Sequence, residues 1–346
     1  MSANAQSVGT EGRVAWVDYA RGLCIVLVVM MHSTLGVEAA AGQEGWLHHA
    51  VAFAKPFRIP AFFLISGLLF AHVVHRDRRA FVDSKILHFV YFYVLWLTIQ
   101  FAFRAPSAIA SGGVGAPLRE YLLAFVDPFG PLWFIYMLPV FYVVTRLTRP
   151  IPAPVVWIAA ALLEAAHVQT SWTLIDEFCA RFVYFYSGFL FARFVIGRAA
   201  ALPAYGWRVP AALALWALVN AVAVRAGWSQ WPGVSLALGF LGAAAVVAVA
   251  ACLAERAWLP AIRAIGRNTL PIYVAFTIPM AVTRTVLLKT GAIPDVGSVS
   301  LLVTAVALVV PLVLAFLVRG TRLGFLFERP AWARLPAPLQ LAGARR

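Results

Sequence analysis

The sequence WVDYARGLCIVLVVMMHST, Trp16 to Thr34, determines the class of fold. Its second part opens an apolar run that is interrupted by His32 and is otherwise typical of a membrane-crossing helix, which needs about 20 mostly apolar residues. Outward from this stretch, similar windows recur along the chain, and together they predict an all-α, polytopic membrane protein with about ten transmembrane helices. The expected spans are 23–40, 57–74, 86–103, 129–146, 152–169, 178–196, 209–226, 233–254, 269–288 and 299–318.

The composition excludes a soluble globular domain. Of the 346 residues, 62% are apolar and only 12% are charged, and the mean hydropathy is +0.85. Soluble domains carry about 25% charged residues, because their surface must be wetted. In lipid, only helices and closed barrels pair all their backbone polar groups. Barrel strands alternate polar and apolar residues, so the continuous runs in this chain favour helices.

Basic residues predict the orientation in the membrane. If the N-terminus is cytoplasmic, the segments on that side hold 20 of the 28 Lys and Arg residues, the outer segments hold 7, and Arg181 lies within the sixth span. This asymmetry is typical of cytoplasmic loops, and it explains the net charge of +14 without a nucleic acid partner. We expect a disordered tail over 1–12, a membrane domain over 13–320 and a cytoplasmic tail over 321–346.

A cleaved secretory leader is a second interpretation of the first span. Basic residues, an apolar stretch and the small residues Ala39 to Ala41 also occur in signal peptides. Cleavage would remove the three residues that we interpret below as the site.

The cysteines and histidines do not predict a metal site. Cys24, Cys179 and Cys252 are odd in number and lie in apolar runs, as small core residues do. No His or Cys pair has the spacing of zinc ligands in a loop. We therefore expect no metal and no permanently bound cofactor.

Ionisable residues of the first span form the main candidate site. Charged groups in spans are costly and usually face a cavity or a partner. Arg21 and His32 are eleven residues apart, so they lie on one helix face, roughly 16 Å apart along the axis. Asp18 precedes Arg21 by one turn and can pair with it. We assign His32 and Asp18 to catalysis and Arg21 to anion binding, an arrangement that suits a long phosphorylated donor such as a coenzyme A thioester. The simpler alternative is that they mark the helix start and bond a neighbouring helix.

The second span and the loop after it add further candidates. Arg58 lies on the outer side, against the charge rule, where it can hold a carbohydrate or stabilise an oxyanion. The first inside loop contains the densest basic cluster, which consists of Arg76, Arg78, Arg79 and Lys85. Positive-inside topology alone explains that cluster, but it can also bind donor phosphates if it faces Arg21.

Three more residues are candidates for substrate binding. Glu164 lies near the outer end of the fifth span, and Arg181 follows Glu177 by four residues, a favourable order for a helical ion pair. Trp133 stands in a proline-flanked turn. Interface anchoring is the simpler explanation for this tryptophan.

Four places in the sequence resemble the acyltransferase family 3 membrane proteins and, within them, the group similar to fucose 4-O-acetylases. WVDYARG at Trp16–Gly22, with His32 further on, resembles the Arg…His motif of the family's first helix. RIPAFFLISGLLF at Arg58–Phe70 resembles its second-helix run. GPLWFIYMLPVFYVV at Gly130–Val144 and IGRNTLPIYVAF at Ile265–Phe276 resemble two weaker motifs.

The resemblance implies ten membrane helices, a cytoplasmic acyl-CoA donor and a glycan acceptor, with catalysis on His32 and donor binding on Arg21. The sequence also departs from the family's pattern. Related proteins often have His in place of Arg58 and in place of Phe276, and commonly have Arg in place of His88. The first two departures are expected to alter acceptor recognition.

The sequence therefore predicts an O-acyltransferase of the bacterial inner membrane. It would move an acyl group, acetyl in the simplest case, from acetyl-CoA or another acyl-CoA to a carbohydrate hydroxyl, so its expected partners are acyl-CoA, a carbohydrate acceptor and the lipid bilayer. His32 would act as general base or as transient acyl carrier. The alternative is a transporter or flippase for a lipid-linked or anionic substrate, because charged and proline-broken spans also occur there.

Overall fold

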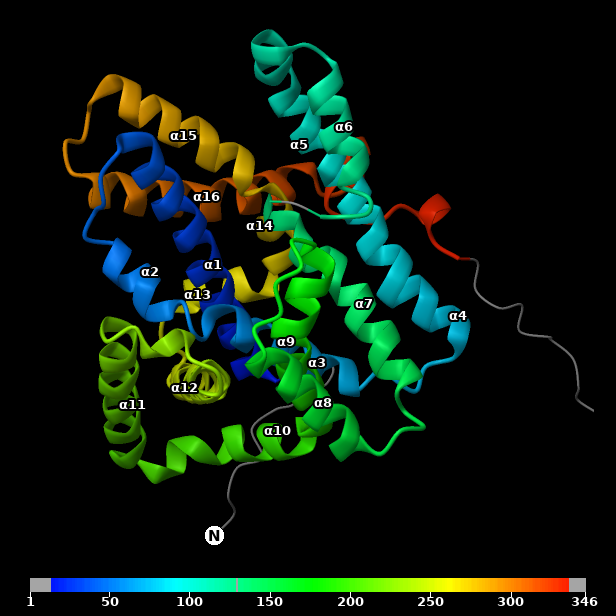
Figure 1. The fold of residues 1–346 in the computed structure, drawn as a ribbon, viewed down its shortest axis with the longest axis vertical. Coiled ribbons are helices and arrows are strands. Elements are labelled where there is room, and N and C mark those ends of the chain that lie inside the picture. The colour runs from blue at the N-terminus through cyan, green and yellow to red at the C-terminus, as the bar shows by residue number, and fades with distance from the viewer. Residues whose placement is uncertain (1–13, 129, 336–346) are drawn as a thin grey trace, which may run out of the picture.

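A computed structural model describes residues 14–128 and 130–335, and its secondary structure over these ranges is entirely helical (Figure 1). The α-helices are α1 (Ala15–Ala41), α2 (His48–Ala54), α3 (Arg58–Ala71), α4 (Arg78–Phe81), α5 (His88–Gly112), α6 (Gly115–Leu123), α7 (Trp133–Leu147), α8 (Ala153–Ala165), α9 (Thr173–Leu190), α10 (Ala192–Ala201), α11 (Arg208–Arg225), α12 (Val234–Glu255), α13 (Pro260–Arg267), α14 (Thr269–Ala275), α15 (Thr277–Thr290) and α16 (Val296–Val318). A π-helix, η1 (Val82–Leu87), joins α4 to α5, and the short 3-10 helices are η2 (Gly130–Leu132), η3 (Leu202–Tyr205), η4 (Trp228–Gln230), η5 (Arg322–Leu326) and η6 (Ala331–Ala333). The tail expected over 1–12 lies outside the described residues.

The helices agree with the expected membrane spans. Within the described ranges, six helical segments are long and apolar enough to cross a membrane, and three bent pairs raise the number to as many as nine. The bent pairs are α2 with α3 at 47°, α9 with α10 and η3 at 72°, and α14 with α15 at 54°. The fifth expected span falls on α8, an apolar helix of only 13 residues. The all-α polytopic class is confirmed, while the number of spans and the side of the termini stay predictions.

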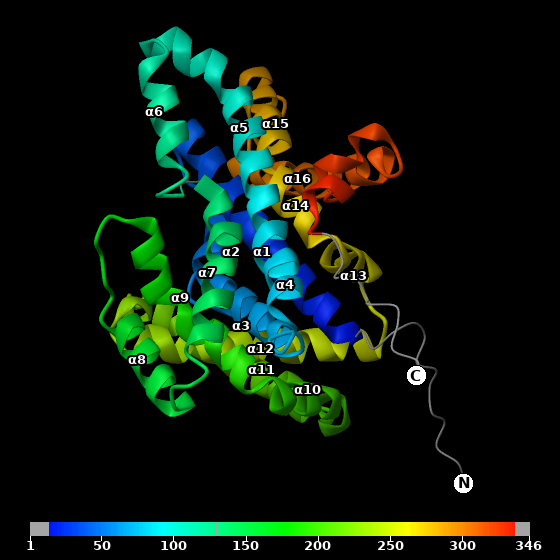
Figure 2. The ribbon, with the colours of Figure 1, turned by 90° about the vertical axis from the view of Figure 1, so that its right-hand side faces the viewer.

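Helix α1 lies inside the bundle, in contact with α3, α12, α13 and α16 (Figure 2). Its buried residues include Trp16, Cys24 and Val28, which belong to the main hydrophobic core. Burial on several sides favours a retained helix over a cleaved leader. The helix runs unbroken for 27 residues, so it carries the first candidate residues as one rigid element.

Helices α3 and α9 cross where each has a glycine, Gly67 on α3 and Gly188 on α9. A Cβ atom on Gly67 would lie 1.9 Å from the carbonyl oxygen of Phe185, and one on Gly188 would lie 1.9 Å from that of Leu64. Small residues at a helix crossing let two backbones approach closely in a membrane bundle. This crossing fixes the position of α3, and with it that of Arg58, relative to α9.

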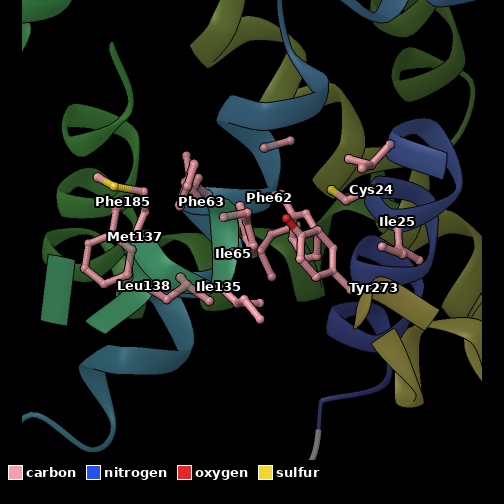
Figure 3. Packing of buried hydrophobic residues seen from close by; sticks show 14 of the residues in the cluster. Cys24, Ile25, Phe62, Phe63, Ile65, Ile135, Met137, Leu138, Phe185 and Tyr273 are labelled. Carbon is pink, nitrogen blue, oxygen red and sulfur yellow. The ribbon is translucent and has the colours of Figure 1, made fainter. Parts of the chain in front are cut away.

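Aromatic side chains fill the space between α1, α3, α7, α9 and α14 (Figure 3). The ring centroid of Phe63 lies 4.5 Å from that of Phe134 and 4.9 Å from that of Phe141. Cys24 and Cys179 are buried, as the interpretation of the cysteines as core residues predicted, whereas Cys252 is only half-buried. The core therefore holds together the helices that carry the candidate residues.

The described part of the C-terminal tail packs back on the bundle. Arg329 donates a hydrogen bond of 2.8 Å to the carbonyl oxygen of Asp83 in η1, and its side chain pairs with the Asp83 carboxylate. The indole of Trp96 on α5 donates one of 2.9 Å to the carbonyl oxygen of Leu326. This part of the tail is therefore anchored to η1 and α5.

Candidate active site

Arg21 on α1 is joined to the start of α14. Its guanidinium donates a hydrogen bond to the hydroxyl of Thr269, the first residue of α14, which is buried. Asp18, only 1% exposed, forms ion pairs of 3.3 Å with Arg267 and 3.9 Å with Arg263 of α13. The predicted pairing of Asp18 with Arg21 stays a prediction. The ion pairs of Asp18 join α1 to α13.

Lys85 is the member of the predicted basic cluster on which the charge of Arg21 acts. The charges of Arg76 and Arg21 both act on its ammonium group, which sits 5.2 Å from the ring centroid of Tyr142. The charge of Arg21 also acts on the Tyr142 phenol, which is buried on α7. We call Asp18, Arg21, Lys85 and Thr269 the Arg21 cluster. Two other residues of the predicted basic cluster, Arg78 and Arg79, are exposed on α4.

His32 lies three turns further along α1, half-buried between two other elements. Its ring centroid is 5.5 Å from that of Phe276, the fully buried residue at the bend between α14 and α15. The charge of Arg58, the first residue of α3, acts on the imidazole. The apolar ring of Phe276 therefore packs on the imidazole of His32, and the positive charge of Arg58 acts on it.

Arg58 is held in place but retains an unused donor. One terminal nitrogen donates a hydrogen bond of 3.1 Å to the carbonyl oxygen of Val51, while its buried Nε has no hydrogen-bond partner in the described part of the chain. The charge of Arg181 acts on Arg58, and Arg181 pairs with Glu177 at 3.1 Å, as the helical spacing predicted. We call His32, Arg58, Glu177 and Arg181 the His32 cluster. A buried Arg donor without an acceptor is costly, so this cluster is suited to binding an oxygen.

The other two predicted residues lie near this cluster or in the core. Glu164 is 5% exposed and accepts a hydrogen bond of 3.1 Å from the hydroxyl of Tyr184, on which the charge of Arg181 also acts. Its second carboxylate oxygen is buried and has no partner among the described residues. Trp133 opens α7 and packs on Phe63, with ring centroids 5.9 Å apart.

The structure therefore places some of the predicted residues in the two clusters around Arg21 and His32 of α1. The predicted residues outside both clusters are Arg76, Arg78, Arg79, Trp133 and Glu164. The sequence interpretation missed Thr269 and Phe276 as neighbours of Arg21 and His32, although both lie in the run Ile265–Phe276 that it singled out. In the residues that the structure describes, no three His, Cys, Asp or Glu side chains are grouped as metal ligands. The chemistry available here is that of an imidazole, guanidinium groups and carboxylates.

Comparison with known proteins supports a membrane acyltransferase family for this chain. A family profile described as an acyltransferase domain matches residues 14–319. The inner membrane protein YcfT of Escherichia coli is 26% identical over 182 residues, which cover 45% of this chain and 50% of that protein. The nodulation protein NolL of Sinorhizobium fredii is 24% identical over 190 residues, or 54% of this chain and 51% of that one. No solved structure matches the chain.

The fold and the family profile together define a polytopic membrane protein of the acyltransferase class. The chain belongs to the acyltransferase 3 family, because the family profile covers nearly its whole length. The chain spans about half the length of the curated relatives it matches.

Proposed function

We propose that this protein is an O-acyltransferase that moves an acyl group, acetyl in the simplest case, from acyl-CoA to a hydroxyl of a cell-envelope or exported carbohydrate. One observation carries the proposal. A single unbroken helix, α1, bears Arg21, which is hydrogen-bonded to Thr269, near one end and His32, which packs on Phe276, three turns away. Membership in an acyltransferase family supports the reaction class. The similarity to the inner membrane protein YcfT supports a bacterial inner-membrane location.

The donor would bind at the Arg21 cluster. Acyl-CoA carries phosphates at one end and a thioester at the end of a long flexible arm. Arg21, Lys85 and the nearby Arg76 can pair with the phosphates, since charge-assisted hydrogen bonds to phosphate are short and strong. The exposed Arg78 and Arg79 would add long-range attraction. The arm then follows the face of α1 toward His32.

The acyl transfer would take place at His32. The neutral imidazole accepts the proton of the acceptor hydroxyl while that oxygen forms a bond to the thioester carbonyl carbon. The carbon–sulfur bond then breaks, and the thiolate of CoA takes up the proton from the imidazolium. Arg58 would stabilise the negative oxygen of the tetrahedral intermediate through its unpartnered Nε.

An acyl-imidazole intermediate is the second route through the same residues. His32 would attack the thioester itself, release the CoA thiolate and pass the acyl group to the acceptor in a second step. Rapid acid quenching followed by mass spectrometry of the peptide that contains His32 separates the two routes.

The acceptor would bind on the outer side of His32. Carbohydrate recognition needs hydrogen-bonding groups fixed in a largely apolar pocket. Arg181 with Glu177, and Glu164 with its unpartnered carboxylate oxygen, provide such groups. Asp18 would act indirectly, because its ion pairs to α13 position the helix segment that bears Arg21.

The proposal is tested with the purified full chain in proteoliposomes. Release of CoA thiol from acetyl-CoA is measured with and without a panel of carbohydrate glycosides, and acylated product is identified by mass spectrometry. We expect thiol release that depends on acceptor and is lost in His32→Ala. Uptake of a lipid-linked or anionic substrate without thiol release would instead support the transport interpretation.

A further inference from the structure

A large groove lies apart from both clusters, between α8, α9, α10, α11 and α12. It has a volume of about 820 Å³, and neither Arg21 nor His32 lines it. We propose that this groove binds an anionic glycerophospholipid, with the phosphate on Arg198 and Arg208 and the acyl chains against its apolar walls. The inference does not depend on the proposed acyl transfer.

The walls of the groove are suited to hydrocarbon. They are built from aliphatic and aromatic side chains, among them Val195, Phe240 and Ala244. Ser187 is one of the few polar residues there, and its hydroxyl already accepts a hydrogen bond of 2.7 Å from the indole of Trp157. A sugar or nucleotide would lose its bonds to water against such walls without replacement. A volume within the range of about 300–1,000 Å³ typical of ligand sites is ample for lipid chains.

Two arginines are the charged residues among the groove's lining. Arg198 lies in the last turn of α10 and Arg208 is the first residue of α11. Neither forms an ion pair with a carboxylate in the described part of the chain, and the Arg198 guanidinium lies 5.3 Å from the ring centroid of Phe194. Two such arginines facing one space form a binding site for phosphate oxygens.

The charged residues of the described groove lining are basic and none is acidic, which favours an anionic over a zwitterionic lipid. A zwitterionic phospholipid brings a cationic amine together with its phosphate, and among the described residues no Asp or Glu lines the groove to receive it. An anionic lipid brings negative charge alone. Charge complementarity therefore favours the anionic lipid.

The arginines lie in a segment with the features of a membrane interface. The chain turns by 72° between α9 and α10, so α10 does not continue the direction of α9 (Figure 1). Large aromatic residues near the arginines are exposed, with Phe194 at 62% and Trp207 at 76%. Exposed aromatic and basic residues together are typical of the headgroup level. At that level Arg198 and Arg208 can bind lipid phosphates, while the parts of the groove formed by α11 and α12 contact the lipid acyl chains.

Native mass spectrometry of the delipidated full chain tests the proposal. Dioleoyl-phosphatidylglycerol and dioleoyl-phosphatidylcholine have the same chains, so their difference in affinity reports on the headgroup. We expect the wild type to prefer the anionic lipid at least ten-fold. Arg198→Gln combined with Arg208→Gln should weaken its binding about thirty-fold, because each arginine near a lipid phosphate contributes about five-fold.

Matched variants distinguish a specific lipid site in the groove from general electrostatic attraction between lipid and protein. Arg193→Gln removes the same charge from the same helix at an exposed position that does not line the groove, and should change affinity less than two-fold. Ala212→Trp fills the groove and should weaken both lipids, whereas Ala214→Trp, two residues further on α11 and outside the lining, should not. Elution volume and thermal unfolding show that each variant is folded.

Three results would overturn the proposal. The first is equal affinity of the wild type for the two lipids. The second is an equal loss in Arg193→Gln and in the double variant. The third is a polyprenyl phosphate that occupies the groove and excludes phosphatidylglycerol, which would make the groove a site for a lipid-linked acceptor.

Discussion

The imidazole of His32 on α1 faces the ring of Phe276, with their centroids 5.5 Å apart, at the bend between α14 and α15. Arg58, from α3, is the charged neighbour of the same imidazole. Phe276 and Arg58 are two of the three positions at which this chain departs from the pattern of the proteins it resembles, and His is frequent there in those proteins. Both departures therefore adjoin the proposed reacting group, which makes them candidates for acceptor selection rather than for donor binding.

Replacing Phe276 tests that assignment. In Phe276→His a polar ring would replace the apolar one beside His32 and add a hydrogen-bonding group to the space for the acceptor. We expect acetyl-CoA affinity to change less than two-fold, and the ratio of products over a panel of glycosides to change at least ten-fold. Both quantities are measured on the purified protein by calorimetry and by mass spectrometry.

Phe276→Leu is the control, since it keeps the wall apolar and should preserve the order of acceptors. A loss of donor affinity equal to the loss of acceptor selectivity would contradict the assignment, because it would mean that Phe276 supports the whole bundle.

Loss of the imidazole at His32 should abolish acyl transfer without unfolding the protein. General base catalysis contributes about 10²- to 10⁴-fold to rate, so we expect His32→Ala and His32→Gln to reduce acceptor-dependent release of CoA by at least 100-fold. Acetyl-CoA binding should remain within a few-fold of wild type, since the proposed site for the donor phosphates lies at Arg21, three turns away. Leu35→Ala, at a position on α1 that is 41% exposed, is the control. Normal turnover in His32→Gln would exclude the mechanism.

The class of fold was predictable from the sequence because it depends on local features, and the relation of Arg21 to His32 on one face of α1 follows from local features too. Apolar composition and the length of apolar runs determine the helices. Helical periodicity alone relates Arg21 to His32, and the i,i+4 rule relates Glu177 to Arg181, a pairing that the structure confirms.

Contacts between distant segments were not predictable in this way. Arg21 and Thr269 are separated by 248 residues, and no period or propensity connects them. The same holds for the anchoring of Arg329 on Asp83. The bend at Phe276 was also missed, since an apolar run indicates that a helix crosses lipid but not where it changes direction.

Lys85 packs over the ring of Tyr142, whereas Arg78 of the same basic cluster is exposed, so the two positions test the proposed donor site differently. We expect Arg21→Ala and Lys85→Ala each to weaken acetyl-CoA binding about 10- to 100-fold, because hydrogen bonds to charged groups contribute about 1.5–3 kcal/mol. Arg78→Ala removes an exposed charge of the same loop and should change affinity less than three-fold. Calorimetry on the purified protein measures all three, and Arg21→Lys should restore part of the binding. An equal loss of acetyl-CoA affinity in all three alanine variants would mean that the donor binds to a general basic surface and not to a specific site.

The crossing of α3 and α9 offers a test of what holds Arg58 in place. Gly188→Ala would put a methyl group 1.9 Å from the carbonyl oxygen of Leu64, where backbone rather than a flexible side chain would have to move. Overpacking of this kind costs about 1–3 kcal/mol and occasionally more, so we expect a lower thermal unfolding temperature in detergent and a loss of acyl transfer.

Gly197→Ala on α10 is the matched control for this crossing. Nothing lies within 4 Å of the added methyl group, and Ala is favoured over Gly in a helix, so its unfolding temperature should be unchanged or slightly higher. If both variants unfold at the wild-type temperature but Gly188→Ala alone loses activity, the crossing positions Arg58 without contributing to stability. If Gly188→Ala retains both stability and activity, the close approach of α3 and α9 is not needed for the site.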